Sequence, residues 1–377
     1  MEVRRPFKFR WWIAWIALAI IFVSAAGWGI RHVTSAQFIE ARLSDAASRA
    51  SEGLYRVTVG SSRFDLFGGT YVATNIDCSP DSLVLVEWER EKKRPRLPIS
   101  LKATTLRVNG INVLALTRGR AIATSATFEN LQFDAFLNRQ VKAVRSGEPA
   151  ALPHVSIRSL DRLVRIDTLV VKAAEASYSE LAADGARAGM ITFNDLEATF
   201  YNVTNDPLRM TPETPCNIGM RFLLAGEGRT NLGVQYDLLS QSDKLDLRYQ
   251  GTIGPMNAKA FNQVLENLEG LRVTGGRLDS TWFEFDVKDD IARGKIQVLY
   301  HNLSFELRDK GSHEQSRGDH FRTFMMSHFK IRDANTPSDK GGAMIAQVHL
   351  ARTPKTGFIK FLWQNIRDGL FETLGIE

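Results

Sequence analysis

The chain has 377 residues, of which 44% are hydrophobic and 24% are charged. This balance is typical of a folded globular body, and it excludes both a disordered chain and a protein that crosses a membrane many times. The formal net charge is +6, but the first ten residues contribute +3 of it, so the remaining charge does not predict a nucleic-acid partner.

The N-terminal region has the pattern of one membrane-spanning helix. Residues 11–30 form a run of twenty residues without a charge, which at about 1.5 Å per residue matches a hydrocarbon core of about 30 Å. No other stretch approaches this length, so a single crossing is predicted. The side chains that we expect to anchor this helix are Trp11, Trp12, Ile13, Trp15, Ile16, Leu18, Ile20, Ile21, Phe22, Val23, Trp28 and Ile30.

A basic flank predicts the orientation of this helix. It consists of Arg4, Arg5, Lys8 and Arg10. Because positively charged flanks stay in the cytoplasm, we expect residues 1–10 to form a cytoplasmic tail and the rest of the chain to lie in the periplasm of a bacterium, bound to the inner membrane. A cleaved secretory signal is the alternative, since Val23-Ser24-Ala25 offers small residues to a peptidase, but the apolar core of a signal is normally about 7–15 residues.

After the membrane segment, residues 31–54 show helical spacing of apolar positions, which predicts a short amphipathic connecting helix. From Tyr55 onward the apolar period changes to two, and residues 55–355 read as one β-rich domain. Short turns between the strands favour an antiparallel meander. The predicted strands are 55–60, 63–76, 83–88, 99–108, 121–136, 164–178, 190–203, 217–225, 232–238, 245–253, 278–287, 294–307 and 321–331.

A few helices interrupt or follow the strands. Residues 111–116 and 257–268 are predicted as short capping helices, and residues 89–98 and 308–320 as solvated connections. Residues 356–377 are predicted as an amphipathic helix, either a lid on the end of the sheet or a helix in a membrane interface. Its apolar stripe consists of Phe358, Ile359, Leu362, Trp363, Ile366, Leu370 and Leu374.

The residues that usually carry chemistry form no recognisable constellation. The two cysteines, Cys78 and Cys216, lack the spacing of a zinc or redox site, and whether they pair is left open. No two of the seven histidines have the i, i+4 spacing of a helical zinc site, and no nucleophile elbow or phosphate loop is present. We therefore predict no enzymatic activity, no metal and no cofactor.

Two internal segments resemble the AsmA-like proteins of diderm bacteria. Residues 106–137 (LRVNGINVLALTRGRAIATSATFENLQFDAFL) are similar to the N-terminal unit of that family, and residues 268–309 to its C-terminal module. The closing FIKFLWQNIRDGLFETLGI resembles the ends of shorter relatives. The resemblance, which includes TamB-like and bridge-like lipid-transfer members, implies a sheet curled into a U-shaped, taco-like groove, and a role in lipid homeostasis or outer-membrane biogenesis.

From the strand pattern and this resemblance we expect a membrane-anchored protein that shields or transfers phospholipid in a β-lined groove. Groove-lining positions would include Val57, Val59, Leu106 and Val108, although the same residues would also suit a closed core. About a dozen strands spaced about 4.8 Å apart give a groove of about 60 Å, which requires a partner protein or self-association to cross the periplasm. The alternative function is a non-enzymatic assembly factor for outer-membrane proteins.

Overall fold

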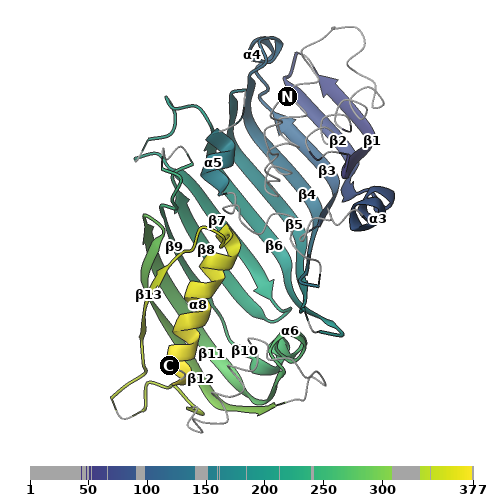
Figure 1. The fold of residues 1–377 in the computed structure, drawn as a ribbon. Helices are drawn as coiled ribbons and strands as arrows, with labels where there is room; N and C mark the ends of the chain where they lie inside the picture. The colour runs from purple at the N-terminus through teal and green to yellow at the C-terminus, as the bar shows by residue number, and fades with distance from the viewer. Residues whose placement is uncertain are drawn as a thin grey trace, which may run out of the picture.

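The computed structural model describes residues 53–65, 67–90, 98–140, 152–158, 160, 162–183, 185–211, 213–238, 242–307, 332–339 and 341–375, together with Ser44, Ser48 and Ser51. Within these ranges the fold is one large, mostly antiparallel sheet that does not close on itself (Figure 1). The strands are β1 (Tyr55–Asp65), β2 (Thr70–Pro80), β3 (Ile99–Asn109), β4 (Ala121–Asn138), β5 (Val164–Leu181), β6 (Ala188–Thr204), β7 (Cys216–Leu224), β8 (Gly228–Tyr236), β9 (Leu247–Ile253), β10 (Met256–Asn257), β11 (Leu271–Lys288), β12 (Ile291–Leu307) and β13 (Ala346–Ala351).

Neighbours in the sheet follow chain order, with the short β10 pairing beside β11. The prediction of a purely antiparallel meander is wrong at one place, because β4 and β5 run parallel. Parallel neighbours need a crossover of a dozen or more residues, and the connection between Asn138 and Val164 is long enough to supply it.

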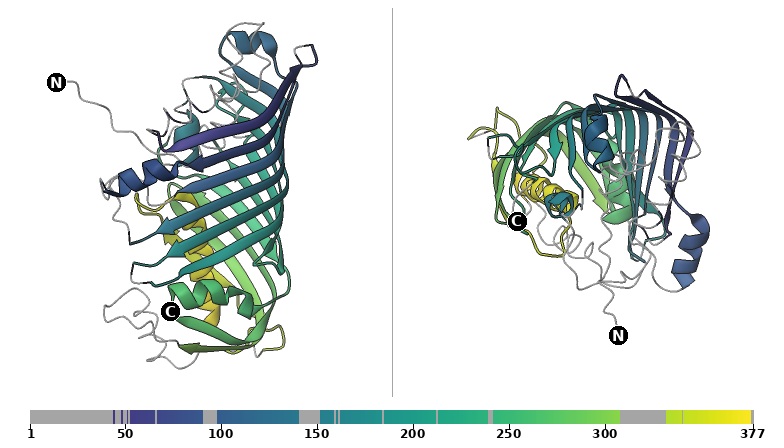
Figure 2. Two further views of the ribbon diagram at one scale, coloured as in Figure 1. Left: turned by 90° about the vertical axis from the view of Figure 1, so that its right-hand side faces the viewer. Right: turned by 90° about the horizontal axis from the view of Figure 1, so that it is seen from above.

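Helices decorate the sheet: α3 (Ser82–Arg90), α4 (Val113–Thr117), α5 (Pro153–Arg158), the 3-10 helix η2 (Ala258–Phe261), α6 (Asn262–Leu268) and α8 (Phe358–Leu374). Figure 2 shows that the sheet curves and that α5, α6 and α8 lie on its concave side. We call this side the inner face. On this face Tyr236 contacts α5 and Gly189 contacts α6. Ile296 and Val348 contact α8.

The strands bend along a line that crosses β1 to β6. Regular pairing is interrupted along this line, and the residues at the interruptions include Asn75, Asn130, Ala173 and Asp195, all with φ near +50°. One extra residue with positive φ resets the alternation, so the buried residues on either side of it, such as Phe128 and Leu131, stay on the same face. The sheet therefore curves while it keeps its apolar face inside.

Most predicted elements are confirmed, including the strands near 99–108 and 121–136 and the helices near 111–116, 257–268 and 356–377. Residues 83–88 were predicted as a strand, which is wrong. They belong to α3, because the Asp81 carboxylate accepts the backbone N–H of Leu83 (2.9 Å) and Val84 (3.5 Å) and so caps a helix.

The single strand predicted over 63–76 is also wrong. It is a hairpin, since Asp65 accepts the backbone N–H groups of Phe67 and Gly68, both at 3.1 Å, and turns the chain between β1 and β2. The predictions for residues 1–30, for most of 31–54 and 89–98, and for 308–331 lie outside the described residues. Among the residues that the structure describes, no helix is both long and apolar enough to span a bilayer.

Candidate functional site

The inner face carries a continuous row of directly paired residues from β2 to β13. Its members are Ala73, Leu106, Phe128, Val171, Ala198, Met220, Leu232, Gly251, Phe283, Ile296 and Ala346. The row is buried at both ends of the sheet, but Met220 and Leu232 in the middle are only half-buried. The inner face is therefore covered at its ends and accessible near its centre.

The predicted groove-lining residues all lie at the covered end. Val57, Val59, Leu106 and Val108 expose between 1% and 7% of their surface and belong to the hydrophobic core. They share the inner face with the accessible centre, but they present little surface to a ligand. Their role in lining a groove stays a prediction.

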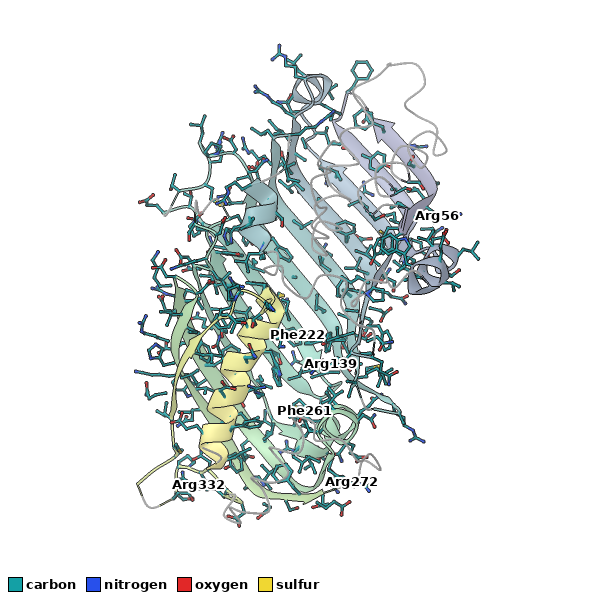
Figure 3. The ribbon with its side chains drawn as sticks, in the orientation of Figure 1. Arg56, Arg139, Phe222, Phe261, Arg272 and Arg332 are labelled. Atoms are coloured by element: carbon teal, nitrogen blue, oxygen red, sulfur yellow. The ribbon has the colours of Figure 1, made fainter. Side chains whose placement is uncertain are left out.

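The accessible centre is an apolar patch that sequence reasoning missed. We call it the inner strip, and it consists of half-buried residues of β5 to β8: Leu169, Leu196, Phe200, Ile218, Met220 and Leu232. Leu169, Phe200 and Ile218 pair in one row, and Met220 and Leu232 pair in the next. Phe193 and Phe222 continue the apolar surface beyond this strip, with ring centroids 5.4 Å apart, and Figure 3 labels Phe222.

Helix α8 lies along the inner face, against β12 and β13, and does not close an end of the sheet. The side of α8 that faces the sheet consists of Phe361, Asn365, Gly369 and Thr373, all buried. Gly369 allows the close approach, because a Cβ at this position would lie 2.0 Å from Ile296 and 2.9 Å from Val348. The apolar stripe predicted to cover the sheet is thus turned partly away from it.

The direction of that stripe follows from the polar flank of α8. The Glu372 carboxylate accepts the backbone N–H of Gln347 at 3.4 Å, which places the polar flank toward the β13 edge. The opposite flank turns toward β8 and β9, where Phe358 stacks on Tyr236 (centroids 5.6 Å apart) and the Leu362 carbonyl accepts the Tyr249 hydroxyl.

We call this second side the apolar flank of α8. It consists of Ile359 and Trp363, which are 55% and 48% exposed, and the half-buried Leu362, Ile366 and Leu370. Of the predicted stripe, Leu374 is buried, Phe358, Leu362, Ile366 and Leu370 are half-buried against the core, and Ile359 and Trp363 are exposed. The inner strip and the apolar flank are thus two apolar surfaces on the concave side of one sheet.

A buried ion pair holds the start of α8. The Arg352 guanidinium binds both carboxylate oxygens of Asp290 (2.7 and 3.0 Å) and also donates to the Thr356 carbonyl at 2.8 Å. Asp290 in turn accepts the backbone N–H of Leu245. The pair therefore joins the β11–β12 turn, the segment before β9 and the approach to α8.

A buried histidine holds α5 against the same side of the sheet. His154 Nε2 lies 2.9 Å from the Ser242 carbonyl, which can only accept, so this nitrogen carries the proton and Nδ1 accepts from the Tyr236 hydroxyl at 2.7 Å. Burial lowers the pKa of His154 from its ordinary value, and the nearby Arg158 adds to this effect against the opposing Ser242 hydrogen bond. His154 is thus a neutral structural link.

The chemistry of the site is that of an apolar surface. Across the described ranges, no three His, Cys, Asp or Glu side chains gather in a set that would hold a metal ion. Cys78 and Cys216 are both buried and unpaired, and burial raises the pKa of each thiol to about 12, so neither is a reactive thiolate. Cys78 and Cys216 are therefore free thiols and do not form a disulfide bond with each other.

A separate hollow of about 690 Å³ lies on the outer, convex-side face of β6 to β11. Its floor is the directly paired Gly219 and Gly233, and Tyr201 and Trp282 stand at its border. An exposed ion pair between Arg221 and Glu197 lies in it. The hollow is open to solvent, and its lining also includes Met220 and Leu232 of the inner strip.

The chain matches no family model, and none of the curated proteins is similar to it in sequence. The resemblance to AsmA-like proteins therefore stays a prediction.

Proposed function

We propose that this is a membrane-anchored periplasmic protein of envelope biogenesis, which shields or transfers the acyl chains of phospholipids between the inner strip and the apolar flank of α8. The observation that carries the proposal is the partial exposure of apolar side chains on the concave side of an open sheet. Contiguous exposed apolar surface is uncommon on soluble domains and marks binding sites. In this proposal the curved sheet is the wall of a U-shaped trough.

The transfer of acyl chains from water to this surface is favourable. Each methylene moved from water to an apolar surface contributes about 0.8 kcal/mol, so about ten buried methylenes contribute about 8 kcal/mol before the cost of association is subtracted. No catalytic group is required. The trough binds one or a few acyl chains and leaves the headgroup in water.

The proposed membrane anchor would place this trough next to the inner membrane. Residues 11–30 would hold the protein in the inner membrane, with residues 1–10 in the cytoplasm. A sheet of this width spans about 60 Å at about 4.8 Å per strand. Transfer over a longer distance would then need self-association or a partner protein in the envelope.

Lipid mass spectrometry on the purified full chain tests the proposal, using two adjacent positions of β8. Leu232→Glu places a charge in the inner strip, whereas Asn231→Glu places the same charge on the exposed outer face. We expect a stoichiometric phospholipid with the parent chain and with Asn231→Glu, and at least a tenfold loss with Leu232→Glu. Equal lipid in both variants, or none in the parent chain across several detergents, contradicts the proposal.

The alternative function, an assembly factor for outer-membrane proteins, is favoured by the open edges of the sheet. Within the described residues, β1 pairs only with β2, and β13 only with β12. An unpaired edge accepts an added strand from a client protein. Crosslinking from β1 that captures one defined outer-membrane protein would support this function, and capture of lipid alone would count against it.

A further inference from the structure

One rim of the sheet carries three large apolar side chains at the tips of its connections. Phe67 in the β1–β2 turn is 103% exposed, Leu114 on α4 is 62% exposed, and Leu208 in the turn after β6 is 88% exposed. Single exposed apolar residues are ordinary, but tips of turns are normally polar. Three exposed apolar side chains on one rim therefore indicate a binding surface.

Backbone hydrogen bonds join these tips into one strip. Ile111, at the start of the α4 connection, donates to the Gly69 carbonyl at 2.9 Å, and Ala121 at its end donates to the Leu163 carbonyl at 2.7 Å. Asn205, before the third tip, donates to the Val164 carbonyl at 3.1 Å. Figure 2 shows α4 beside the β1–β2 turn at the same end of the molecule.

Local structure explains why Leu114 points outward. The Asn112 side chain caps α4 by accepting the Ala115 N–H at 2.8 Å. Ala115 and Leu116 are then the buried residues of this short helix. Leu114 is not part of the core, so a smaller or polar residue would serve the fold equally well.

Exposed arginines accompany the apolar tips. Arg118, Arg120 and Arg162 are exposed, and the Arg162 guanidinium lies 3.4 Å from where a Cβ of Gly119 would be. Arg209 directly follows Leu208. No described carboxylate forms an ion pair with any of these four residues, whereas many arginines elsewhere in the sheet are paired.

Acidic residues of the same strip accept hydrogen bonds from neutral groups of their own loop. Asp206 accepts the Leu208 N–H at 3.0 Å, and Glu213 accepts the Thr211 hydroxyl at 2.7 Å. Asp161 is the acidic neighbour of Arg162 in the sequence, and it lies outside the described residues. Asp65 likewise accepts the N–H groups of Phe67 and Gly68 in the β1–β2 turn. These carboxylates keep their charge, so the positive charge of the strip lies with Arg118 and Arg120 directly after α4.

We propose that this strip, which we call the tip rim, docks on the surface of an anionic lipid bilayer. Phe67, Leu114 and Leu208 would enter the interface, while the four arginines bind headgroup phosphates. Bulky apolar tips with adjacent guanidinium groups suit that layered environment better than they suit a protein surface, because no fixed shape is needed. This inference rests on residues outside the trough, so it holds or fails independently of lipid binding there.

A fluorescent probe on the full chain in nanodiscs tests the proposal. Because both native cysteines are buried, an environment-sensitive thiol reagent will label the introduced cysteine in Phe67→Cys, Leu114→Cys or Leu208→Cys. Tyr201→Cys, on the outer face and 53% exposed, is the matched control. With phosphatidylglycerol in the disc or in added vesicles, we expect a blue shift and quenching by nitroxide lipid at the tips, but not at position 201.

Charge reversal sharpens the test. Arg118→Glu with Arg120→Glu should weaken vesicle binding about fivefold or more for each arginine removed, and high salt should do the same to the parent chain. An unchanged emission at all three tips, or equal changes at the tips and at Tyr201→Cys, overturns the proposal. Mass spectrometry of the same preparation shows separately whether the trough still holds lipid.

Discussion

Two leucines in the same cross-strand row show how the two parts of the inner face differ. Leu106 on β3 is 3% exposed, whereas Leu232 on β8 is only half-buried. Both lie at inward positions of regular strands and belong to one continuous row of paired residues. The alternation of apolar residues therefore selects the face of the sheet, but the segments packed across that face decide which part stays accessible.

This difference teaches that the site depends on the position of α8 as much as on the strands. Phe361, Asn365, Gly369 and Thr373 of α8 face the sheet, whereas Ile359 and Trp363 remain exposed. A helix that turned its full apolar stripe to the sheet would cover β8 and β9 and remove the second apolar surface. Mutating the residues that hold α8 in place therefore tests whether its position keeps the inner strip accessible.

The largest effect is expected from Arg352→Met, which removes one partner of the buried pair with Asp290. Removing one partner of a fully buried pair costs about 3–5 kcal/mol. Because the Asp290 side chain is 18% exposed and keeps the Leu245 N–H, we expect a loss at the lower end of this range, about 3 kcal/mol. Urea unfolding monitored by circular dichroism measures this loss. Arg248→Met, which breaks the exposed pair with Asp286 across two strands, is the control and should cost about 0–1 kcal/mol. Equal losses would contradict the structural role of the Arg352 pair.

Truncation of the two leucines sharpens the comparison itself. Leu106→Ala should lower the free energy of unfolding by about 2–5 kcal/mol, because it leaves a cavity in a closed core. Leu232→Ala removes a half-exposed side chain and should cost about 1 kcal/mol. Thermal unfolding of the two variants measures the difference. A cost for Leu232→Ala as large as that for Leu106→Ala would mean that the inner strip is also closed.

Gly369→Ala tests the close packing of α8 against the sheet. A glycine in a helix is normally improved by alanine, by about 1 kcal/mol. Here the added methyl would meet Ile296, so we expect a net loss of about 1–3 kcal/mol and a displaced helix. Hydrogen exchange of the α8 amides should increase. A gain in stability with unchanged exchange would contradict the close contact.

The smallest expected effect is a change in pH dependence at His154. Its lowered pKa means that the folded state resists protonation, while the unfolded chain binds a proton below about pH 6.5. Stability should therefore fall as the pH falls below about 6.5, by at most about 1.4 kcal/mol per pH unit from this group. In His154→Gln this part of the slope should vanish, whereas His349→Gln, at an exposed position, should keep it.

Much of the fold follows from the sequence because the inner-face pattern is strong. The alternation in residues 99–108 and 121–136 predicts β3 and β4 correctly, and apolar spacing predicts α8. Residues 83–88 misled the prediction, since Leu83, Leu85 and Val84, Val86 suit either period, and the Asp81 cap decides for a helix. The positive-φ residues such as Asn75 and Asn130 also escape detection, because one extra residue in a strand leaves little sequence signal.

The candidate site is less predictable than the fold. The apolar positions 196, 198 and 200, and 218, 220 and 222, carry the period of two that points to one face. Nothing in that period separates an accessible residue such as Met220 from a buried one such as Val171. Exposure is a property of tertiary packing, and here it depends on Gly369 and on the Arg352 pair, which hold α8 in place.

Crosslinking in cells with a phospholipid that carries a photoactivatable acyl chain tests the central claim most directly. The claim is that acyl chains lie between the inner strip and the apolar flank of α8. It predicts adducts on residues such as Met220, Leu232 and Trp363, and none on the outer-face residues Tyr201 and Asn231 that alternate with the strip. Adducts that are absent, or that fall equally on both faces of the sheet, would contradict it.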